Sequence, residues 1–372
     1  MPQPNTSKRR LLLGALAALA AQAALASPSP APPRPKRPAT PRRPANESAA
    51  APAGTRYAGH PQAMAFAEAV AAAHGMDAAV LRDQVGQARR IDSVRRLVMP
   101  PPAGVAKNWA AYRARFIDTA RVQAGLAFWR AHERWLLLAE ERWGVPPEIV
   151  TAIVGVETFY GRVMGNFRVI DALATLAFDF PTGRRDRSAF FRSELEELFV
   201  LAAREGSNPL TVKGSYAGAM GLPQFMPSSV NRYAVDFSGD GHIDLHTNAA
   251  DVVGSVAHYL AAFGWQRGQP THYGVAVPVD SIDRAALLAP DILPSFSAAQ
   301  FAERGARLDA PGQAHEGPLA LVELQNGDLA PSYVAGTQNF YVITRYNWSS
   351  YYAMAVIDLA ASLRRGMDRS PR

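Results

Sequence analysis

A run of uncharged residues at 149–156 ends at one carboxylate, Glu157, and no other feature constrains the fold of the chain as strongly. Two prolines and a glutamate lead into the run, which is typical of a first helical turn, so we expect a helix that starts near Pro147. At helical spacing, Glu157 shares a face with Val150 and Ile153. The carboxylate is therefore expected to project from the most buried side of this helix.

A carboxylate in apolar surroundings is suited to donate a proton. Burial disfavours the anion and raises the pKa, so the group stays protonated near neutral pH, as a general acid must. The alternative is a core glutamate that a nearby arginine such as Arg162 satisfies. The helix by itself does not decide between these two interpretations.

Residues 1–26 have the organisation of a secretory signal peptide. A basic segment at 7–10 precedes an uncharged leucine and alanine run, which ends in a small-residue cleavage site at 24–26. We expect the mature chain to begin near Ser27 without a stable membrane span, because the run is short and rich in alanine for a span of about 20 apolar residues. The two arginines also weakly resemble a twin-arginine signal, so the export route stays open.

Residues 27–55 are rich in proline, alanine and arginine, which predicts a disordered linker. The leader carries three basic residues and the linker five basic and one acidic, so together they account for the whole net charge of +7. The remainder is near neutral, and nucleic-acid binding loses its compositional support. A solubilising spacer is favoured over an arm that reaches across a polyanionic envelope. There is no cysteine, which excludes disulfides and an acylated lipoprotein anchor.

The region 56–372 is expected to be mainly α-helical, with a small β part (α+β). Apolar residues recur at helical spacing, and Asp77 and Asp118 are expected helix caps. Asn326-Gly327 after an apolar run predicts a hairpin turn. The expected parts are a helical part at 56–144, a core at about 145–268 and 336–372, and a small β-containing insertion at about 270–335.

Two glycine-rich segments, 155–166 and 213–229, carry the other chemical signals. Glycine allows a polymer to approach the backbone closely, and Ser215 and Gln224 suit sugar hydroxyl and N-acetyl groups. Together the segments resemble the lytic murein transglycosylases of the B type, periplasmic enzymes that cleave the glycan strands of peptidoglycan. The resemblance covers about 57–372, and the matching phrases are those around Glu157 and at 171–176, 218–221, 224–229, 233–241 and 344–347.

This resemblance implies a lysozyme-like catalytic core with a helical companion domain, and a mechanism with one carboxyl group. Glu157 would protonate the glycosidic oxygen between N-acetylmuramic acid and N-acetylglucosamine, and then take the proton of the muramoyl C6 hydroxyl as that oxygen attacks C1. The product is a 1,6-anhydro end, and no cofactor takes part. An intramolecular nucleophile needs no second carboxylate to activate water. We assign Asp171 and Asp179 to capping or surface roles.

The same resemblance implies which residues contact the substrate. The expected contacts are Ser215, Gln224, Tyr112, Tyr259, Asn339, Tyr341, Tyr346, Arg184 and Arg185. Tyrosine rings pack on sugar faces while their hydroxyls bond sugar oxygens. The segment 181–188 is longer than the family pattern, so the sequence leaves open which arginine meets the peptide or lactyl carboxylate.

The segment 236–244 has the opening of a calcium loop, with oxygen side chains at alternate positions and glycine at the sixth. Position twelve is Thr247 instead of a glutamate. The family closes its unusual EF-hand with a later aspartate. The expected ligands are Asp236, Ser238, Asp240, the carbonyl of His242, and Asp251. A structural Ca²⁺, or Na⁺, is expected here in preference to a metal-free turn or a calcium switch.

Two other functions stay open on the sequence. The first is a hydrolytic muramidase on the same scaffold, which would leave reducing ends. The second is a peptidoglycan-binding protein without catalytic activity. The partners expected are glycan strands and proteins of cell-wall synthesis or remodelling, in the periplasm.

Overall fold

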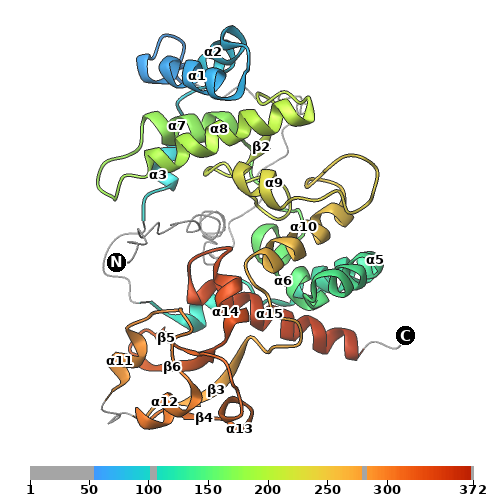
Figure 1. Ribbon diagram of the computed structural model, residues 1–372, viewed down its shortest axis with the longest axis vertical. Helices are drawn as coiled ribbons and strands as arrows, with labels where there is room; N and C mark the ends of the chain where they lie inside the picture. Colours follow the sequence, from blue (N-terminus) through green and yellow to red (C-terminus); the bar gives the residue numbers. More distant parts are fainter. Residues whose placement is uncertain (1–53, 101–106, 279–282, 370–372) are drawn as a thin grey trace, which may run out of the picture. The chain divides into compact units, whose positions relative to one another are not determined.

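Helices dominate the residues that the structure describes, as the sequence predicts, and two small sheets accompany them, of which the sequence predicts the one in the β insertion. The computed structural model describes residues 54–100, 107–278 and 283–369 (Figure 1). The expected signal peptide and residues 27–53 of the expected linker lie outside these ranges. The described residues form two units: the first unit, 54–100 and 165–218, and the second unit, 107–164, 219–278 and 283–369.

The first unit is built mainly from helices. Its elements are α1 (Pro61–His74), α2 (Ala78–Gln87), α3 (Asp92–Leu97), β1 (Phe167–Arg168), α7 (Val169–Phe178), α8 (Ser188–Glu205) and β2 (Lys213–Gly214). Helices α1 and α2 pack together, as do α7 and α8, and β1 pairs with β2 in antiparallel orientation. Asp77 caps α2 through the N–H groups of Ala79 and Val80, which confirms the expected cap.

Asp171 and Asp179 both serve the packing of the first unit. Asp171 is 1% exposed, binds the guanidinium of Arg168 through both oxygens at 2.7 and 2.8 Å, and accepts the N–H of Arg89. Asp179 accepts the hydroxyl of Tyr57 at 2.5 Å. A surface role is therefore wrong for Asp171, because the folded unit buries its carboxylate and brings Arg89 to it from a distant part of the sequence.

The second unit contains the helix that the uncharged run predicts. Its helices are α4 (Trp109–Ala114), α5 (Thr119–Trp143), α6 (Pro147–Thr158), α9 (Pro227–Tyr233), α10 (Ala249–Ala262), α11 (Arg284–Leu288), α12 (Ala298–Glu303), α13 (Ala310–Gln313), α14 (Gln338–Thr344) and α15 (Ser350–Asp368). Helix α6 starts at Pro147, as expected, and α5, α10 and α15 pack against it (Figure 1). Every residue of α6 except Glu148 is buried, so this helix has no exposed face.

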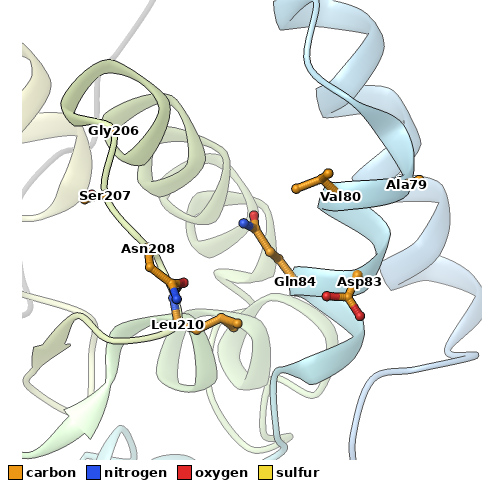
Figure 2. A pocket seen from close by; sticks show the side chains of 8 residues that line it. All are labelled: Ala79, Val80, Asp83, Gln84, Gly206, Ser207, Asn208 and Leu210. Carbon is orange, nitrogen blue, oxygen red and sulfur yellow. Dashed lines mark hydrogen bonds between the residues drawn. The ribbon is translucent and has the colours of Figure 1, made fainter.

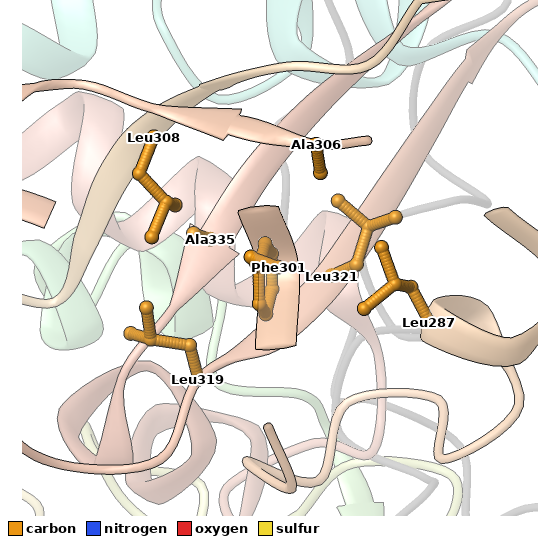
Figure 3. Close-up of a cluster of buried hydrophobic side chains, with 7 residues drawn as sticks. All are labelled: Leu287, Phe301, Ala306, Leu308, Leu319, Leu321 and Ala335. Atoms are coloured by element: carbon orange, nitrogen blue, oxygen red, sulfur yellow. The ribbon is translucent and has the colours of Figure 1, made fainter. Parts of the chain in front are cut away.

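A four-stranded antiparallel sheet lies in the part predicted as a β insertion. Its strands are β3 (His272–Ala276), β4 (Arg307–Leu308), β5 (Ala320–Asn326) and β6 (Leu329–Gly336), in the order β4-β3-β6-β5. The β5–β6 hairpin turns at Asn326-Gly327, where Gly327 has a φ angle of 67°. Figure 3 shows the sheet's own small core: Leu287, Phe301, Ala306, Leu308, Leu319, Leu321 and Ala335.

The boundary between the units differs from the one expected from the sequence. The sequence assigns 56–144 to one helical part, whereas α5 (Thr119–Trp143) belongs to the second unit. Packing gives the reason, because α5 lies along both α6 and α10 and covers their apolar faces. Among the described residues, no helix combines the length and apolar character needed to cross a membrane.

Candidate active site

Glu157 lies in the last turn of α6 and is 7% exposed. The hydroxyl of Tyr352, on α15, donates a hydrogen bond to Glu157 Oε1 at 2.6 Å. Burial raises the pKa of Glu157 to about 8, although the Tyr352 hydrogen bond opposes this rise by favouring the anion. The carboxyl group is therefore mostly protonated at neutral pH, as the sequence predicts for a proton donor.

No cation neutralises this carboxyl group within the described chain. Burial and Tyr352 are what shift the pKa of Glu157. Arg162, the alternative partner considered from the sequence, instead places its guanidinium over the ring of Phe159, with Cζ 4.6 Å from the ring centroid. The geometry thus favours a neutral acid over a glutamate held in a core ion pair.

The chain reverses directly after the carboxylate. Phe159 and Tyr160 have φ angles of 51° and 57°, a left-handed conformation that costs about 1 kcal/mol for a residue with a side chain. Thr158 Oγ1 donates to the carbonyl of Leu222 at 3.0 Å and accepts the N–H of Gly161 at 3.1 Å. These contacts hold the turn, and with it the end of the helix that carries Glu157.

Three of the tyrosines expected to contact substrate lie within electrostatic reach of Glu157. Burial, with a further contribution from Glu157, raises the pKa of Tyr112 to about 12, and it raises the pKa values of Tyr259 and Tyr346 as well. All three hydroxyls therefore stay protonated. The ring of Tyr346 lies 4.8 Å from that of Tyr259 and stacks on that of Tyr352 at 6.4 Å. The structure thus brings these side chains together around the acid.

Tyr352 is a site residue that the sequence reasoning missed. It is fully buried on α15, and 195 positions separate it from Glu157. A usable signal was present, because Tyr352 shares a helical face with Val356 and Leu359, and a tyrosine on an apolar face needs a partner for its hydroxyl. No local pattern, however, identifies that partner.

The two neutral hydrogen-bonding residues lie in different units. Gln224 is buried in the second unit with a φ angle of 51°, and its amide donates to the carbonyls of Gly221 at 2.9 Å and Met164 at 3.3 Å. Ser215 is buried in the first unit, and its hydroxyl accepts the N–H of Ala217 at 3.3 Å. Their contacts with substrate stay predictions.

Asn339 and Tyr341, both on α14, occupy different surroundings. Asn339 is fully buried, and its amide group binds the backbone of Gln266 and Gln269 at 2.7 to 2.8 Å. The structure therefore does not bring Asn339 to an exposed position. Tyr341 is half-buried, and its hydroxyl accepts a long hydrogen bond of 3.4 Å from Arg345.

The two arginines expected to meet a carboxylate belong to the first unit. Arg184 donates to the carbonyl of Val98 and lies over the ring of Phe180. Arg185 is exposed. Neighbouring Arg187, which the sequence did not single out, lies over Phe190, with Cζ 4.6 Å from the ring centroid. Contact of Arg184 or Arg185 with substrate stays a prediction.

The expected calcium loop is held together by its own hydrogen bonds. Asp236 accepts the N–H groups of Gly239 and Gly241, and fully buried Asp251 accepts those of Phe237, Ser238 and Asp244 at 2.9 to 3.1 Å. The Asn248 amide donates to Ser238 Oγ at 2.9 Å and to Asp240 Oδ2 at 3.4 Å. The oxygen atoms of this loop suit a hard cation, but both carboxylate oxygens of Asp251 accept hydrogen bonds from backbone N–H groups. Among the described residues, no three acidic or histidine side chains gather as a metal site.

A hollow in the first unit has fewer groups suited to catalysis than the surroundings of Glu157. Figure 2 shows it between α2 and the loop that follows α8. It is lined by Ala79, Val80, Asp83, Gln84, Gly206, Ser207, Asn208 and Leu210. Asp83 is its one acidic group, and that carboxylate already accepts the amide of Gln87 at 2.6 Å. We therefore place the chemistry at Glu157.

Comparisons with known proteins identify the family of this chain. The family described as Transglycosylase SLT domain matches residues 58–361. Membrane-bound lytic murein transglycosylase B of Escherichia coli (strain K12) is 42% identical over 318 residues, which cover 83% of this chain and 84% of that protein. The crystal structure of soluble lytic transglycosylase SltB1 from Pseudomonas aeruginosa matches with a TM-score of 0.75 and 39% identity, covering 83% of this chain and 100% of the other.

A third relative is the Escherichia coli lytic transglycosylase Slt35 in complex with calcium. Its structure matches with a TM-score of 0.72 and 40% identity, and the match covers 85% of this chain and 96% of the other. The fold and these relatives define a peptidoglycan-cleaving lyase with a mainly α, lysozyme-like fold. The chain belongs to the transglycosylase SLT domain family, and it is a lytic murein transglycosylase. The resemblance drawn from the sequence is thereby confirmed.

Proposed function

We propose that Glu157 alone supplies both proton transfers of the lytic reaction. As a neutral acid it protonates the glycosidic oxygen, the bond from C1 to that oxygen breaks, and the N-acetylglucosamine hydroxyl leaves. The resulting carboxylate takes the proton of the muramoyl C6 hydroxyl while O6 bonds to C1, which closes the 1,6-anhydro ring and restores the acid. The observation that carries this proposal is a buried carboxyl group with no cationic partner in the described chain.

A single carboxyl group fits an intramolecular displacement better than hydrolysis. Glycosidases of the usual kind hold a second carboxylate about 5 to 9.5 Å from the acid, to attack C1 or to activate water. Of the carboxylates in the described ranges, none contributes to the pKa of Glu157, and Asp171 and Asp179 are engaged in the packing of the first unit. The C6 hydroxyl needs no such helper, because it is already part of the reacting sugar.

We further propose that Tyr352 positions the carboxyl group and stabilises its anionic form. Its hydroxyl donates to Oε1 at 2.6 Å, and such a hydrogen bond strengthens when the acceptor becomes charged. The anion that forms after the first proton transfer is therefore held until it removes the C6 proton. Tyr352 is a positioning residue in this scheme, because it acts through Glu157.

The substrate contacts form part of the same proposal. Tyr112, Tyr259 and Tyr346 supply rings around Glu157, which suits sugar faces, and the hydroxyl of Tyr112 suits sugar oxygens. The hydroxyls of Tyr259 and Tyr346 already donate to the carbonyls of Arg345 and Pro223. The remaining contacts proposed from the resemblance are Ser215, Gln224, Tyr341, Arg184 and Arg185. Full burial of Asn339 limits its part to holding the backbone in place.

We also propose that the loop at 236–251 binds a structural Ca²⁺ or Na⁺. Asp236, Ser238, Asp240 and the carbonyl of His242 would supply oxygen ligands, and Asp251 would close the site. The calcium complex of Slt35 supports calcium as the ion. The ion would stabilise the loop and take no part in proton transfer.

Export to the periplasm is the location that we propose, on the strength of the signal-like segment 1–26. The relatives act on murein by name, and the substrate lies in that compartment. Proteins of cell-wall synthesis or remodelling are the further partners that we propose. Localisation of a fusion to a reporter that is active only after export tests this part directly.

Digestion of purified sacculi tests the mechanism. Mass spectrometry of the products from the wild-type chain should give 1,6-anhydromuramoyl ends, and Glu157→Gln should give no turnover. Reducing ends would instead establish a hydrolytic muramidase. Equal turnover by the wild type and Glu157→Gln would remove Glu157 from its role, and tight binding to sacculi without turnover by the wild type would establish a binding protein.

A further inference from the structure

An arginine surrounded by aromatic rings lies in the turn between α14 and α15. Arg345 places its guanidinium over three rings, with Cζ 5.1 Å from the centroid of Phe263, 5.8 Å from that of Tyr341 and 5.5 Å from that of Trp348. Its hydrogen-bonding contact with another side chain is the 3.4 Å bond to the Tyr341 hydroxyl. Among the described residues, no aspartate or glutamate forms an ion pair with it. We name these four residues the Arg345 cluster.

Trp348 gives the Arg345 cluster an exposed apolar surface. It is 39% exposed, and its ring stands nearly perpendicular to that of Tyr341, at 89° and 6.0 Å between centroids. Among the described phenylalanine, tyrosine and tryptophan side chains, Trp348 is the one that counts as exposed, and it lies beside a cation. The face of such a ring can stack on a sugar, while the neighbouring guanidinium keeps its N–H donors free.

The Arg345 cluster is continuous with the surroundings of Glu157. The carbonyl of Arg345 accepts the hydroxyl of Tyr259 at 2.7 Å, and the ring of Tyr259 lies 4.7 Å from that of Phe263. Tyr259 in turn contacts Tyr346, which stacks on the Tyr352 that binds the acid. A glycan that places a glycosidic bond at Glu157 extends over several sugars, so a contact for a neighbouring sugar is expected on this side of the second unit.

Physical chemistry indicates what the cluster selects. A guanidinium held over aromatic rings is fixed in orientation and partly shielded from water, so a carboxylate that approaches its edge can make two parallel charge-assisted hydrogen bonds. A neutral sugar gains the ring contact but not these bonds. The ligand that satisfies both halves of the cluster is a sugar that carries a carboxylate.

We propose that Arg345 and Trp348 form a subsite for the carboxylate-bearing sugar of the substrate, which makes them residues of substrate specificity. The proposal rests on the proposed function and adds to it. A muramoyl residue offers this carboxylate in two forms. A naked strand carries it on the lactyl group, whereas a peptide-bearing strand carries it on the stem peptide.

Binding by the inactive Glu157→Gln chain separates these sources. Isothermal titration would use three probes: naked glycan fragments, peptide-bearing fragments, and neutral N-acetylglucosamine oligomers. Arg345→Gln in this background should weaken binding of at least one carboxylate-bearing probe about tenfold, and leave the neutral oligomer within twofold. Trp348→Ala should weaken all three probes. The probe that loses affinity on Arg345→Gln identifies the source of the carboxylate.

Matched variants control for general effects of charge and folding. Arg142→Gln removes another arginine that lies over a tryptophan, Trp143 at 4.8 Å, outside the cluster, and should leave all three affinities unchanged. Arg345→Lys keeps the charge without the planar fork, and should lose part of the affinity. Thermal melts identify a variant that has not folded, and Trp348→Leu replaces one that fails.

The failure of this proposal is distinct from failure of the proposed function. Equal affinities of the Arg345→Gln and parent chains for both carboxylate-bearing probes would overturn the subsite, whatever the role of Glu157. An equal loss for the neutral oligomer would also overturn it, since it would show a structural effect. Turnover retained by the Glu157→Gln chain alone would overturn the mechanism and leave the subsite measurements intact.

Discussion

Replacement of Glu157 by glutamine should abolish activity and stabilise the fold, and the stabilisation should depend on pH. The carboxyl group has a pKa of about 8 in the folded chain against a reference value of 4.5. The unfolded chain therefore loses its proton first, and the charge then favours unfolding at every pH above the reference value. The resulting loss in the free energy of unfolding is absent below about pH 4.5, grows through neutral pH, and becomes constant above about pH 8. Glutamine cannot ionise, so the Glu157→Gln variant does not have this free-energy cost.

The size of the effect follows from the width of this pH window. One pKa unit corresponds to about 1.4 kcal/mol, so Glu157→Gln should raise the free energy of unfolding by on the order of 3 kcal/mol at pH 7 and by close to nothing at pH 4. For a folded region of this size, the melting temperature at pH 7 should rise by roughly 5 °C. Urea denaturation at pH 4, 5.5, 7 and 8.5 measures the trend.

Glu148→Gln is the matched control, because Glu148 lies in the first turn of the same helix and pairs with Arg364 at 2.6 Å near the surface. That substitution should destabilise the fold by at most about 1 kcal/mol. If Glu157→Gln destabilised the fold at pH 7, or stabilised it equally at every pH, the carboxyl group would not be buried and neutral in the manner described.

Three further predictions concern other groups of the second unit. Tyr352→Phe removes a hydrogen bond that favours the Glu157 anion, so the pKa of the acid should rise. The pH above which kcat/KM falls should then move upward from about 8 by about one unit, and kcat should be lower. An unmoved pH profile would contradict the positioning role. Tyr160→Phe should stabilise the fold by about 1 kcal/mol in urea denaturation, because the Tyr160 hydroxyl is buried without a partner in the described chain. A loss of stability would show that this hydroxyl forms a hydrogen bond. Calcium at about 10 mM should raise the melting temperature of the wild type by a few degrees but not that of Asp240→Asn, whose substituted side chain is exposed; equal shifts would move the ion to another site.

Helix α6 shows what local rules predict well. Prolines and an acidic residue mark its start at Pro147, and the uncharged run up to Val156 requires a buried helix, so both the element and the special position of Glu157 follow from nearby residues. The turn at Asn326-Gly327 is a similar case, since the glycine takes a positive φ angle where a hairpin requires one.

Local rules do not predict which elements pack against each other. The periodicity of α5 shows an apolar face, but nothing in it says that this face covers α6 and α10, and the predicted boundary near residue 144 therefore differs from the observed one. Asn339 is another case, because a polar side chain beside tyrosines suggests a sugar contact until its amide is seen bound to the backbone of Gln266 and Gln269.

The sequence by itself determined that this chain forms a buried helix ending in one carboxylate, since helix signals act over a few residues. Only the tertiary structure decided how that carboxylate behaves. Its pKa depends on which helices exclude water and on a hydroxyl 195 positions away, Tyr352. The cation of the Arg345 cluster likewise meets Phe263, which directly follows α10 and is distant in sequence. Desolvation and hydrogen bonding act between neighbours in space, and the chain creates those neighbours when it folds.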